Sequence, residues 1–218
     1  MSLDRKNKIA KRAEQEISDG QVINLGIGIP TLILSYLDAQ KAVTVHSENG
    51  ILGMGAHCGL EEADRNLIDA GGGYVRLENG GAYCDSVLSF SLVRGGRLDI
   101  AFLGALQISA AGDLANWMIP GKYSPGIGGG MELAQKARRV VVTTFHNHKG
   151  GDPKIVAECT MPLTAKSCVT RIITELAVID IVEGQLHLKE IAVETSIDEV
   201  VSKTGGPLVF NENTVKRF

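Results

Sequence analysis

"RLDIAFLGALQ", residues 97–107, is the stretch that decides the fold. Beyond Arg97 and Asp99 it is almost continuously apolar, without the alternation of apolar and polar residues that is typical of a strand with one face in water. Parallel strands covered by helices on both faces have this composition. The stretch therefore predicts a buried strand of a parallel sheet.

The segments on either side alternate between strand and helix patterns. Expected strands lie at 21–28, 41–47, 74–77 and 138–146, and expected helices lie at 4–19, 31–39, 87–95 and 131–137. Gly20 is a stop for the first helix, Pro30 suits the start of the second, and Asp85 or Ser86 can cap the third. Residues 112–130 form a long irregular segment that holds the single tryptophan.

The C-terminal third continues the alternation. We expect a helix at 166–176, a hairpin that turns at 183–185, and a helix capped by Ser196 with Glu199. Strands that mostly alternate with helices predict an α/β fold, with a mainly parallel sheet flanked by helices. Without an internal repeat or a linker, residues 1–218 are expected to form a single domain.

Composition narrows the class of protein. The 218 residues are 44% hydrophobic and 22% charged, with a net charge of −3, as expected of a globular protein. The chain has neither a basic stripe nor a basic amphipathic helix, which argues against nucleic acid and membrane partners. The N-terminus is too polar for a secretory signal, and the four cysteines form no C-x-x-C pair. We therefore expect a cytoplasmic protein with free thiols.

Two motifs that suggest cofactors are incomplete. "GIGIPT" (26–31) lacks the third glycine of a dinucleotide-binding turn, and no acidic residue follows at the expected distance. A tight turn between strand and helix, which can face a ligand, fits it better. "HNH" (146–148) offers two imidazoles without an evident third ligand, so no metal site is predicted.

A glycine cluster, "GIGGGM" (126–131), precedes an expected helix. Such a loop presents backbone N–H groups without side chains in the way, which suits a phosphate, a carboxylate or a developing oxyanion. A loop without a ligand is an equal alternative from the local sequence.

Glu48 lies in "SENGILGMG" (47–55), directly after an expected strand. Open α/β sheets bind ligands at the carboxyl ends of their strands, so this carboxylate is a candidate for catalysis. A surface carboxylate that begins a turn is the alternative, because Asn-Gly is a common turn pair.

These motifs, taken together, resemble those of one known protein family. "NLGIGIPT" (24–31), "SENGILGMG" and "GDLANWMIPGK…GIGGGM" (112–131) resemble the B (β) subunit of the 3-oxoacid CoA-transferases, which are family I CoA-transferases. The resemblance runs from about residue 5 to about residue 210. It implies the CoA-transferase fold, which sugar-phosphate isomerases share.

The activity that the resemblance implies is transfer of coenzyme A between an acyl-CoA and a short-chain acid such as acetoacetate, in ketone-body or short-chain acid metabolism. Coenzyme A and acyl-CoA would be substrates, with no permanently bound cofactor. An A (α) subunit would be the partner, in a heterodimer or heterotetramer.

The resemblance also implies roles for individual residues. Glu48 would be the nucleophile, which becomes a glutamyl-CoA thioester in ping-pong catalysis. The N–H of Gly129 would stabilise the oxyanion. Residues expected to bind substrate flank these two and the first glycine turn: Gly26, Gly28, Asn49, Gly50, Gly128 and Gly130.

Three departures from the family pattern bear on the substrate. Gly72 stands where many relatives have lysine, Ala56-His57-Cys58 replaces a proline-aromatic pair, and Val87-Leu88 replaces an acidic or polar pair. If these line the acyl pocket, the acid is more apolar or longer than the usual succinate and acetoacetate. Two other functions stay open: a sugar-phosphate isomerase-like enzyme with Glu48 as base, and a non-catalytic ligand-binding subunit.

Overall fold

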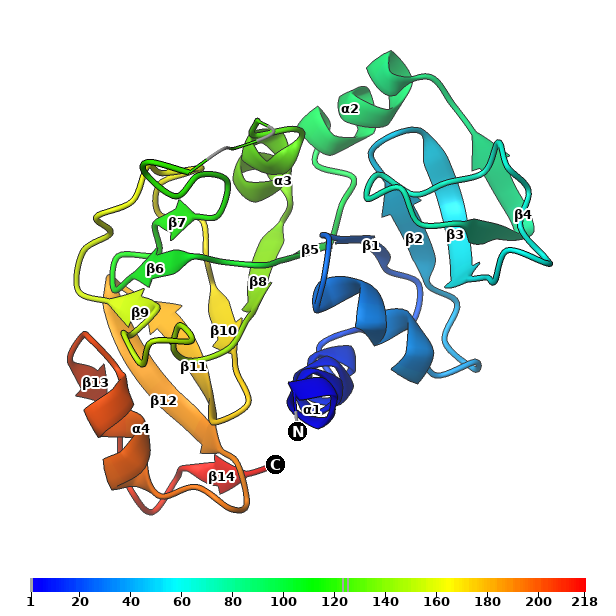
Figure 1. The fold of residues 1–218 in the computed structure, drawn as a ribbon. Helices are drawn as coiled ribbons and strands as arrows, with labels where there is room; N and C mark the ends of the chain where they lie inside the picture. Colours follow the sequence, from blue (N-terminus) through cyan, green and yellow to red (C-terminus); the bar gives the residue numbers. More distant parts are fainter. Residues whose placement is uncertain (1, 123, 125) are drawn as a thin grey trace.

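The computed structural model describes residues 2–122, 124 and 126–218. Among these residues, the main sheet has eleven strands in the order β13-β12-β11-β10-β8-β5-β1-β2-β3-β4, with β14 paired to β12 (Figure 1). Its strands are β1 (Val22–Leu25), β2 (Thr44–Ser47), β3 (Ile51–His57), β4 (Val75–Tyr83), β5 (Ile100–Leu103), β8 (Arg139–Thr143), β10 (Arg171–Ile173), β11 (Ala177–Val182), β12 (Gln185–Ile191), β13 (Leu208–Val209) and β14 (Lys216–Arg217).

A small second sheet and five helices complete the fold of the residues described. The second sheet contains β6 (Gln107–Ser109), β7 (Leu114–Ala115) and β9 (Ile155–Val156) in the order β7-β6-β9. The helices described are α1 (Ser2–Glu14), the 3-10 helix η1 (Pro30–Tyr36), α2 (Ser86–Arg94), α3 (Gly130–Lys136) and α4 (Ile197–Lys203). Within the described part of the chain, no helix is long and apolar enough to cross a membrane.

The centre of the main sheet is parallel, as the sequence predicts. Strands β10, β8, β5, β1 and β2 are neighbours that all run in the same direction. Antiparallel partners, β3 with β4 and β11 with β12, extend the sheet on its two sides. The prediction of an α/β fold with a mainly parallel sheet flanked by helices is confirmed.

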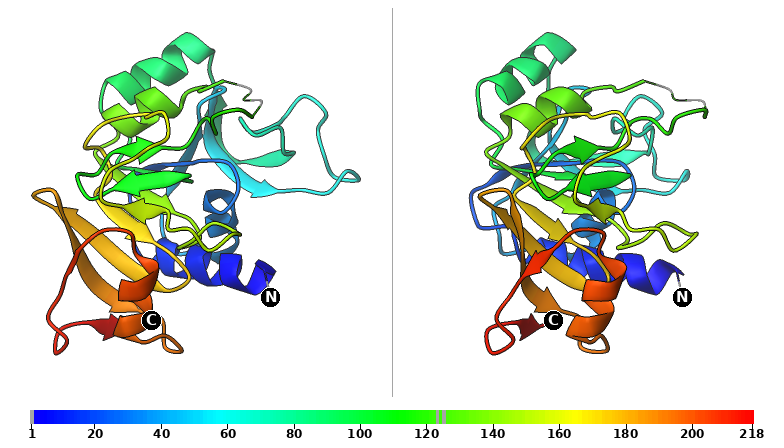
Figure 2. Two further views of the ribbon diagram at one scale, coloured as in Figure 1. Left: turned by 60° about the vertical axis from the view of Figure 1, so that its left-hand side comes forward. Right: turned by 90° about the vertical axis from the view of Figure 1, so that its left-hand side faces the viewer.

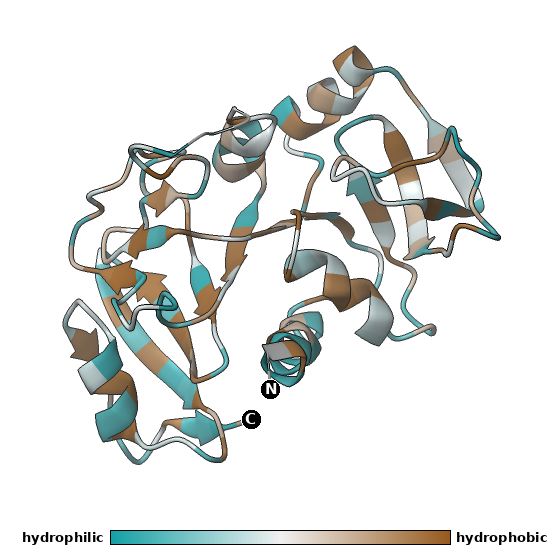
Figure 3. Ribbon diagram, in the orientation of Figure 1, coloured by the Kyte–Doolittle hydropathy of each residue, from teal (hydrophilic) through white to brown (hydrophobic). Residues whose placement is uncertain are grey.

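Strand β5 explains why the opening stretch is so apolar. All four of its residues are buried, and successive side chains point to opposite faces of the sheet. Ile100 and Phe102 pack in the core beneath α1 and η1, whereas Ala101 and Leu103 pack in the core beneath α2, α3 and α4. Figure 3 shows hydrophobic residues concentrated along these central strands.

The predicted helix at 166–176 is wrong. This segment contains β10, which pairs with β8 on one side and β11 on the other. Val169, Ile172 and Leu176 are spaced as on a helix face, but Ile172 and Ile173 are both fully buried because the strand has core on both faces. β-Branched residues such as these favour a strand.

Other boundaries shift without changing the topology. Helix α1 ends at Glu14 instead of residue 19, the segment after Pro30 is a 3-10 helix, and β4 is longer than the expected strand at 74–77. The apolar stretch after Glu48 is strand β3. Of the irregular segment 112–130, residues 123 and 125 lie outside the described residues.

Several local signals are confirmed. Asp85 caps α2 by accepting a hydrogen bond from the Leu88 N–H at 2.8 Å, and Ser196 caps α4 by accepting one from the Glu199 N–H. The hairpin between β11 and β12 turns at Glu183 and Gly184, which both have positive φ.

Helices α2 and α3 lie side by side in both views of Figure 2.

Candidate active site

Glu48 lies on the tight turn that joins β2 to β3, where its side chain is partly exposed. The Gly50 N–H closes this turn by donating to the Ser47 carbonyl at 3.0 Å. Gly50 has φ of +115°, and a Cβ there would lie 2.0 Å from the Cys84 carbonyl oxygen. Because its N–H is already used and its Cα is tightly enclosed, Gly50 shapes the turn that presents Glu48.

Two buried polar side chains hold Glu48 from different elements. The Asn24 amide, on β1, donates to Glu48 Oε2 at 3.2 Å. The Ser89 hydroxyl, on α2, donates to the Glu48 backbone carbonyl at 2.9 Å. Asn24 and Ser89 are both completely buried, so these two donor side chains are shielded from water.

His46 links the same two residues. Its Nε2 lies 2.8 Å from Ser89 Oγ and its Nδ1 lies 3.2 Å from Asn24 Nδ2. Burial lowers the pKa of His46 to about 4, so the ring is neutral near neutral pH. Since the Ser89 hydroxyl donates to Glu48, it must accept from His46 Nε2–H, which leaves Nδ1 to accept from Asn24. This arrangement accounts for the hydrogen bonds of Ser89 and the His46 ring. The two N–H groups of Asn24 are shared among three acceptors, which are His46 Nδ1, the His46 carbonyl and Glu48 Oε2. The buried Asn24 Oδ1 has no hydrogen-bond partner among the described residues.

Gly129 lies directly beside Glu48. It precedes the first residue of α3, and a Cβ added to it would lie 3.4 Å from Glu48 Cγ and 2.9 Å from the Phe90 ring. Among the hydrogen bonds of the described residues, none uses the Gly129 N–H. The structure thus brings together the carboxylate and the glycine that the sequence predicts as nucleophile and oxyanion donor.

The other six candidates for substrate binding lie in different positions relative to Glu48. Gly26 donates its N–H to the Phe102 carbonyl at 2.8 Å, and Asn49 donates its side-chain amide to the Ile68 carbonyl at 2.7 Å. Gly28 and Gly128 are exposed and have positive φ, whereas Gly130 is the first residue of α3. Of the six candidates, Gly128 and Gly130 directly flank the Gly129 contact with Glu48, and Gly50 shapes the Glu48 turn.

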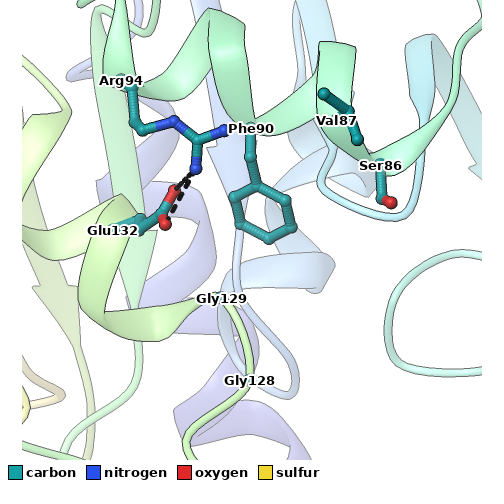
Figure 4. Close-up of a pocket in the computed structure, with 7 residues that line it drawn as sticks. All are labelled: Ser86, Val87, Phe90, Arg94, Gly128, Gly129 and Glu132. Carbon is teal, nitrogen blue, oxygen red and sulfur yellow. Dashed lines mark hydrogen bonds and ion pairs between the residues drawn. The ribbon is translucent and has the colours of Figure 1, made fainter.

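A pocket of about 270 Å³ lies between α2 and the start of α3 (Figure 4). It is lined by Ser86, Val87, Phe90, Arg94, Gly128, Gly129 and Glu132. Figure 4 shows the Phe90 ring projecting from α2 toward the Gly129 loop, and the Arg94 guanidinium meeting the Glu132 carboxylate. The ion pair, with Nη1 at 2.9 Å and 3.0 Å from the two carboxylate oxygens, ties α2 to α3.

The first histidine of "HNH", His146, takes a structural position. His146 is fully buried between the hydroxyls of Thr174 and Thr204, at 3.0 Å and 2.9 Å. In the part of the chain that the structure describes, no group of three or more His, Cys, Asp or Glu side chains could hold a metal ion.

The sequence reasoning missed four residues that hold the site: Asn24, His46, Ser89 and Phe90. Asn24 carries a usable signal, because it is the single polar side chain in the strand "VINL". A polar group at the centre of a buried strand needs a partner, so its position predicts a polar network. Ser89 and Phe90 carry no comparable signal, since their partners come from distant parts of the chain.

Comparison with known proteins now decides the family. The family model described as "Coenzyme A transferase" matches residues 6–203. The chain belongs to the coenzyme A transferase family. The beta subunit of a probable coenzyme A transferase from Bacillus subtilis is 47% identical over 94% of each chain. The B subunit of a 3-oxoadipate CoA-transferase from Pseudomonas putida is 46% identical over 94% of this chain and 96% of its own.

The fold of this coenzyme A transferase is also found in a solved structure. An acyl-CoA transferase from Escherichia coli O157:H7 superposes with a TM-score of 0.77 at 21% identity. The match covers 98% of this chain but 43% of that longer one. At this identity the likeness concerns the fold alone, and this chain spans less than half the length of that protein.

Proposed function

We propose that this chain is the B-type subunit of a CoA-transferase and carries the nucleophile Glu48. With an A subunit, it moves coenzyme A from an acyl-CoA to a short-chain carboxylic acid of the 3-oxoacid class. The observation that carries the proposal is the contact between Gly129 and Glu48: a glycine with an unused N–H lies against a partly exposed carboxylate. Membership of the family supports the reaction class.

The first half-reaction moves coenzyme A onto the protein. A Glu48 carboxylate oxygen attacks the carbonyl carbon of the acyl-CoA, the carbon–sulfur bond breaks, and coenzyme A leaves as a thiolate. The product is an anhydride between Glu48 and the acyl group. The thiolate then attacks the Glu48 carbonyl carbon of this anhydride, which releases the first acid as a carboxylate and leaves a glutamyl-CoA thioester.

The second half-reaction repeats these steps in reverse. The carboxylate of the acceptor acid attacks the glutamyl thioester, expels the thiolate and forms a new anhydride. The thiolate attacks the acyl carbonyl carbon, which gives the new acyl-CoA and restores the Glu48 carboxylate. No net proton is consumed, so the site needs to orient charges instead of supplying a strong acid or base.

Each residue at the site has a role in this scheme. The Gly129 N–H donates to the oxygen that becomes negative as each carbonyl is attacked, a contribution worth about 10²–10³ in rate for one such donor. Asn24, hydrogen-bonded to Glu48 Oε2, orients the carboxylate so that the other oxygen is free to attack. Gly128 and Gly130 leave the approach to Gly129 open for the substrate.

The surface near the site fits a partner protein. Ile27, beside the first glycine turn, is 72% exposed, and Val87 and Leu88, on the first turn of α2, are 70% and 52% exposed. Apolar side chains with this exposure are suited to burial in a protein interface. We propose that an A subunit covers this edge in a heterodimer or heterotetramer, and that the assembly works in the cytoplasm as one domain per chain.

The same departures from the family pattern bear on the acid. Val87 lines the pocket beside Gly129, and Gly72 contributes no side chain to its exposed turn. Arg94 and Glu132 also line this pocket, but they are paired with each other. We propose that Val87, in place of a polar residue, favours an acyl group that is more apolar or longer than succinate. His57 is paired with Asp69 at 2.8 Å, so it braces this turn.

The test is an exchange assay on the chain co-expressed with an A-type partner. Acyl-CoA donors are paired with acids of graded length and polarity, and new acyl-CoA is measured by mass spectrometry. We expect exchange by the pair and none by either protein alone, since this chain supplies a nucleophile without a complete binding site. Full turnover by rigorously partner-free protein, or sugar-phosphate isomerisation without exchange, would refute the proposal.

A further inference from the structure

Helix α2 contacts both halves of the site through consecutive residues. Ser89 donates a hydrogen bond to the Glu48 carbonyl, and Phe90 packs its ring against Gly129. We propose that α2 is a spacer that sets the separation between the Glu48 carboxylate and the Gly129 N–H, with Ser89 and Phe90 as its two positioning residues. The inference rests on the proposed function, because it assigns these residues to the geometry of that reaction.

The Ser89 contact fixes the nucleophile turn. Ser89 is completely buried, and its hydroxyl has one donor partner in His46 and one acceptor in Glu48. Removing the hydroxyl would leave the His46 Nε2–H and the Glu48 carbonyl without this hydrogen-bond partner. The turn that carries the Glu48 carboxylate would then be held less firmly in the orientation needed for attack. Ser89 bonds to the backbone of Glu48 and not to its carboxylate, so it acts on position rather than on the chemistry.

The Phe90 contact fixes the donor loop. A Cβ at Gly129 would lie 2.9 Å from two atoms of the ring, so the glycine Cα is already in close contact with it. The ring therefore limits how far the loop can approach α2. Glu48 Cγ would lie 3.4 Å from the same Gly129 Cβ, so the loop also borders the Glu48 side chain. A smaller side chain would remove this limit, so the distance between the donor loop and Glu48 would no longer be fixed by α2.

Both ends of α2 are anchored to the elements that it spaces. At its start, Cys84 donates its N–H to the Gly50 carbonyl at 2.9 Å, within the Glu48 turn, and Asp85 caps the helix. At its end, Arg94 pairs with Glu132 on α3, the helix that begins just after Gly129 (Figure 4). Because both ends are anchored, the helix can hold the Glu48 turn and the Gly129 loop at a constant distance from each other.

The experiment compares Ser89→Ala and Phe90→Leu with Ser91→Ala, a matched control. Ser91 lies on the same helix, is exposed, and bonds to the Val87 carbonyl instead of to the site. The complex with the A subunit is mixed with saturating acyl-CoA, and the single-turnover rate of thioester formation on Glu48 is followed by quenched-flow mass spectrometry. The KM for acyl-CoA and the unfolding midpoint are measured in parallel.

We expect Ser89→Ala and Phe90→Leu to slow thioester formation by about tenfold to a hundredfold, because a displacement near 1 Å is enough for such a loss. Ser89→Ala should leave the KM for acyl-CoA within about twofold, since Ser89 is completely buried and lies outside the pocket. Phe90 lines the pocket, so its positioning effect is read from the rate of thioester formation at saturating acyl-CoA. Ser89→Thr, which keeps the hydroxyl, should recover part of the rate, and Ser91→Ala should match the wild type.

Wild-type rates in Ser89→Ala and Phe90→Leu would overturn the spacer and leave the proposed function intact. Slow variants with no rescue by Ser89→Thr, and with a loss that simply follows the drop in unfolding midpoint, would also overturn it, because they indicate general destabilisation. A wild-type complex that forms no thioester would overturn the proposed function and the spacer together.

Discussion

Replacing Gly129 with alanine tests how closely the glycine loop approaches Glu48, the proposed nucleophile. The backbone of Gly129, with φ of −79° and ψ of −1°, is accessible to alanine, so the protein should fold. The added methyl group would lie 2.9 Å from the Phe90 ring and 3.4 Å from Glu48 Cγ. Carbon atoms prefer a separation of about 3.5–4.0 Å, so the loop or the ring must move by roughly 0.6 Å or more.

A shift of this size is expected to cost about tenfold to a hundredfold in kcat, given that about 1 Å can cost about a hundredfold. Steady-state exchange by the complex measures it, with circular dichroism to check the fold. Gly59→Ala, outside the proposed site, is the comparison, because its Cβ would meet no atom within 4 Å and the change should cost far less. Combining Gly129→Ala with Phe90→Leu should recover part of the loss. Wild-type kcat for folded Gly129→Ala would refute the proximity of this residue to Glu48.

Two further predictions concern stability. Gly50→Ala forces a side chain onto φ of +115° and against the Cys84 carbonyl, so chemical denaturation should show a loss of more than about 2 kcal/mol; an unchanged midpoint would contradict the turn geometry. Burial lowers the pKa of His46 and His146 from 6.5 to about 4, so the unfolded chain binds more protons between these values. Their contribution to stability is complete above pH 6.5 and is lost as the pH falls toward 4, by up to about 3 kcal/mol per pH unit for the pair. A free energy of unfolding that stays flat from about pH 6.5 to about pH 5 would contradict the burial of both rings.

Local chemistry made much of the fold predictable. The apolar run around β5, the Asp85 cap and the turn at Glu183 and Gly184 each depend on residues close in sequence, so their patterns can be read directly. The segment 166–176 failed because its apolar spacing fits a helix face, while its strand character depends on core from both sides of the sheet. Burial on two faces is a tertiary property that a single segment does not encode.

The residues of the candidate site also fall into those that the local sequence indicates and those that only tertiary contacts reveal. Glu48 and Gly129 stand out because a carboxylate after a strand and a glycine cluster before a helix are unusual locally, and the family resemblance assigned their roles. Asn24 and Ser89 emerge from contacts between β1, α2 and the Glu48 turn, which are far apart in sequence. The contacts that hold Glu48 and Gly129 near each other therefore depend on how distant elements pack, which the local sequence does not encode.

The most direct test of the account is the covalent state of Glu48. The complex with the A subunit is incubated with acyl-CoA and no acceptor acid, and the peptide that contains "SENG" is analysed by mass spectrometry. The account predicts a thioester on Glu48, which borohydride reduces to an alcohol and hydroxylamine converts to a hydroxamate. Glu48→Ala should abolish both the adduct and exchange, whereas Cys58→Ala should keep both. An adduct on Cys58, or normal exchange by Glu48→Ala, would contradict the central claim.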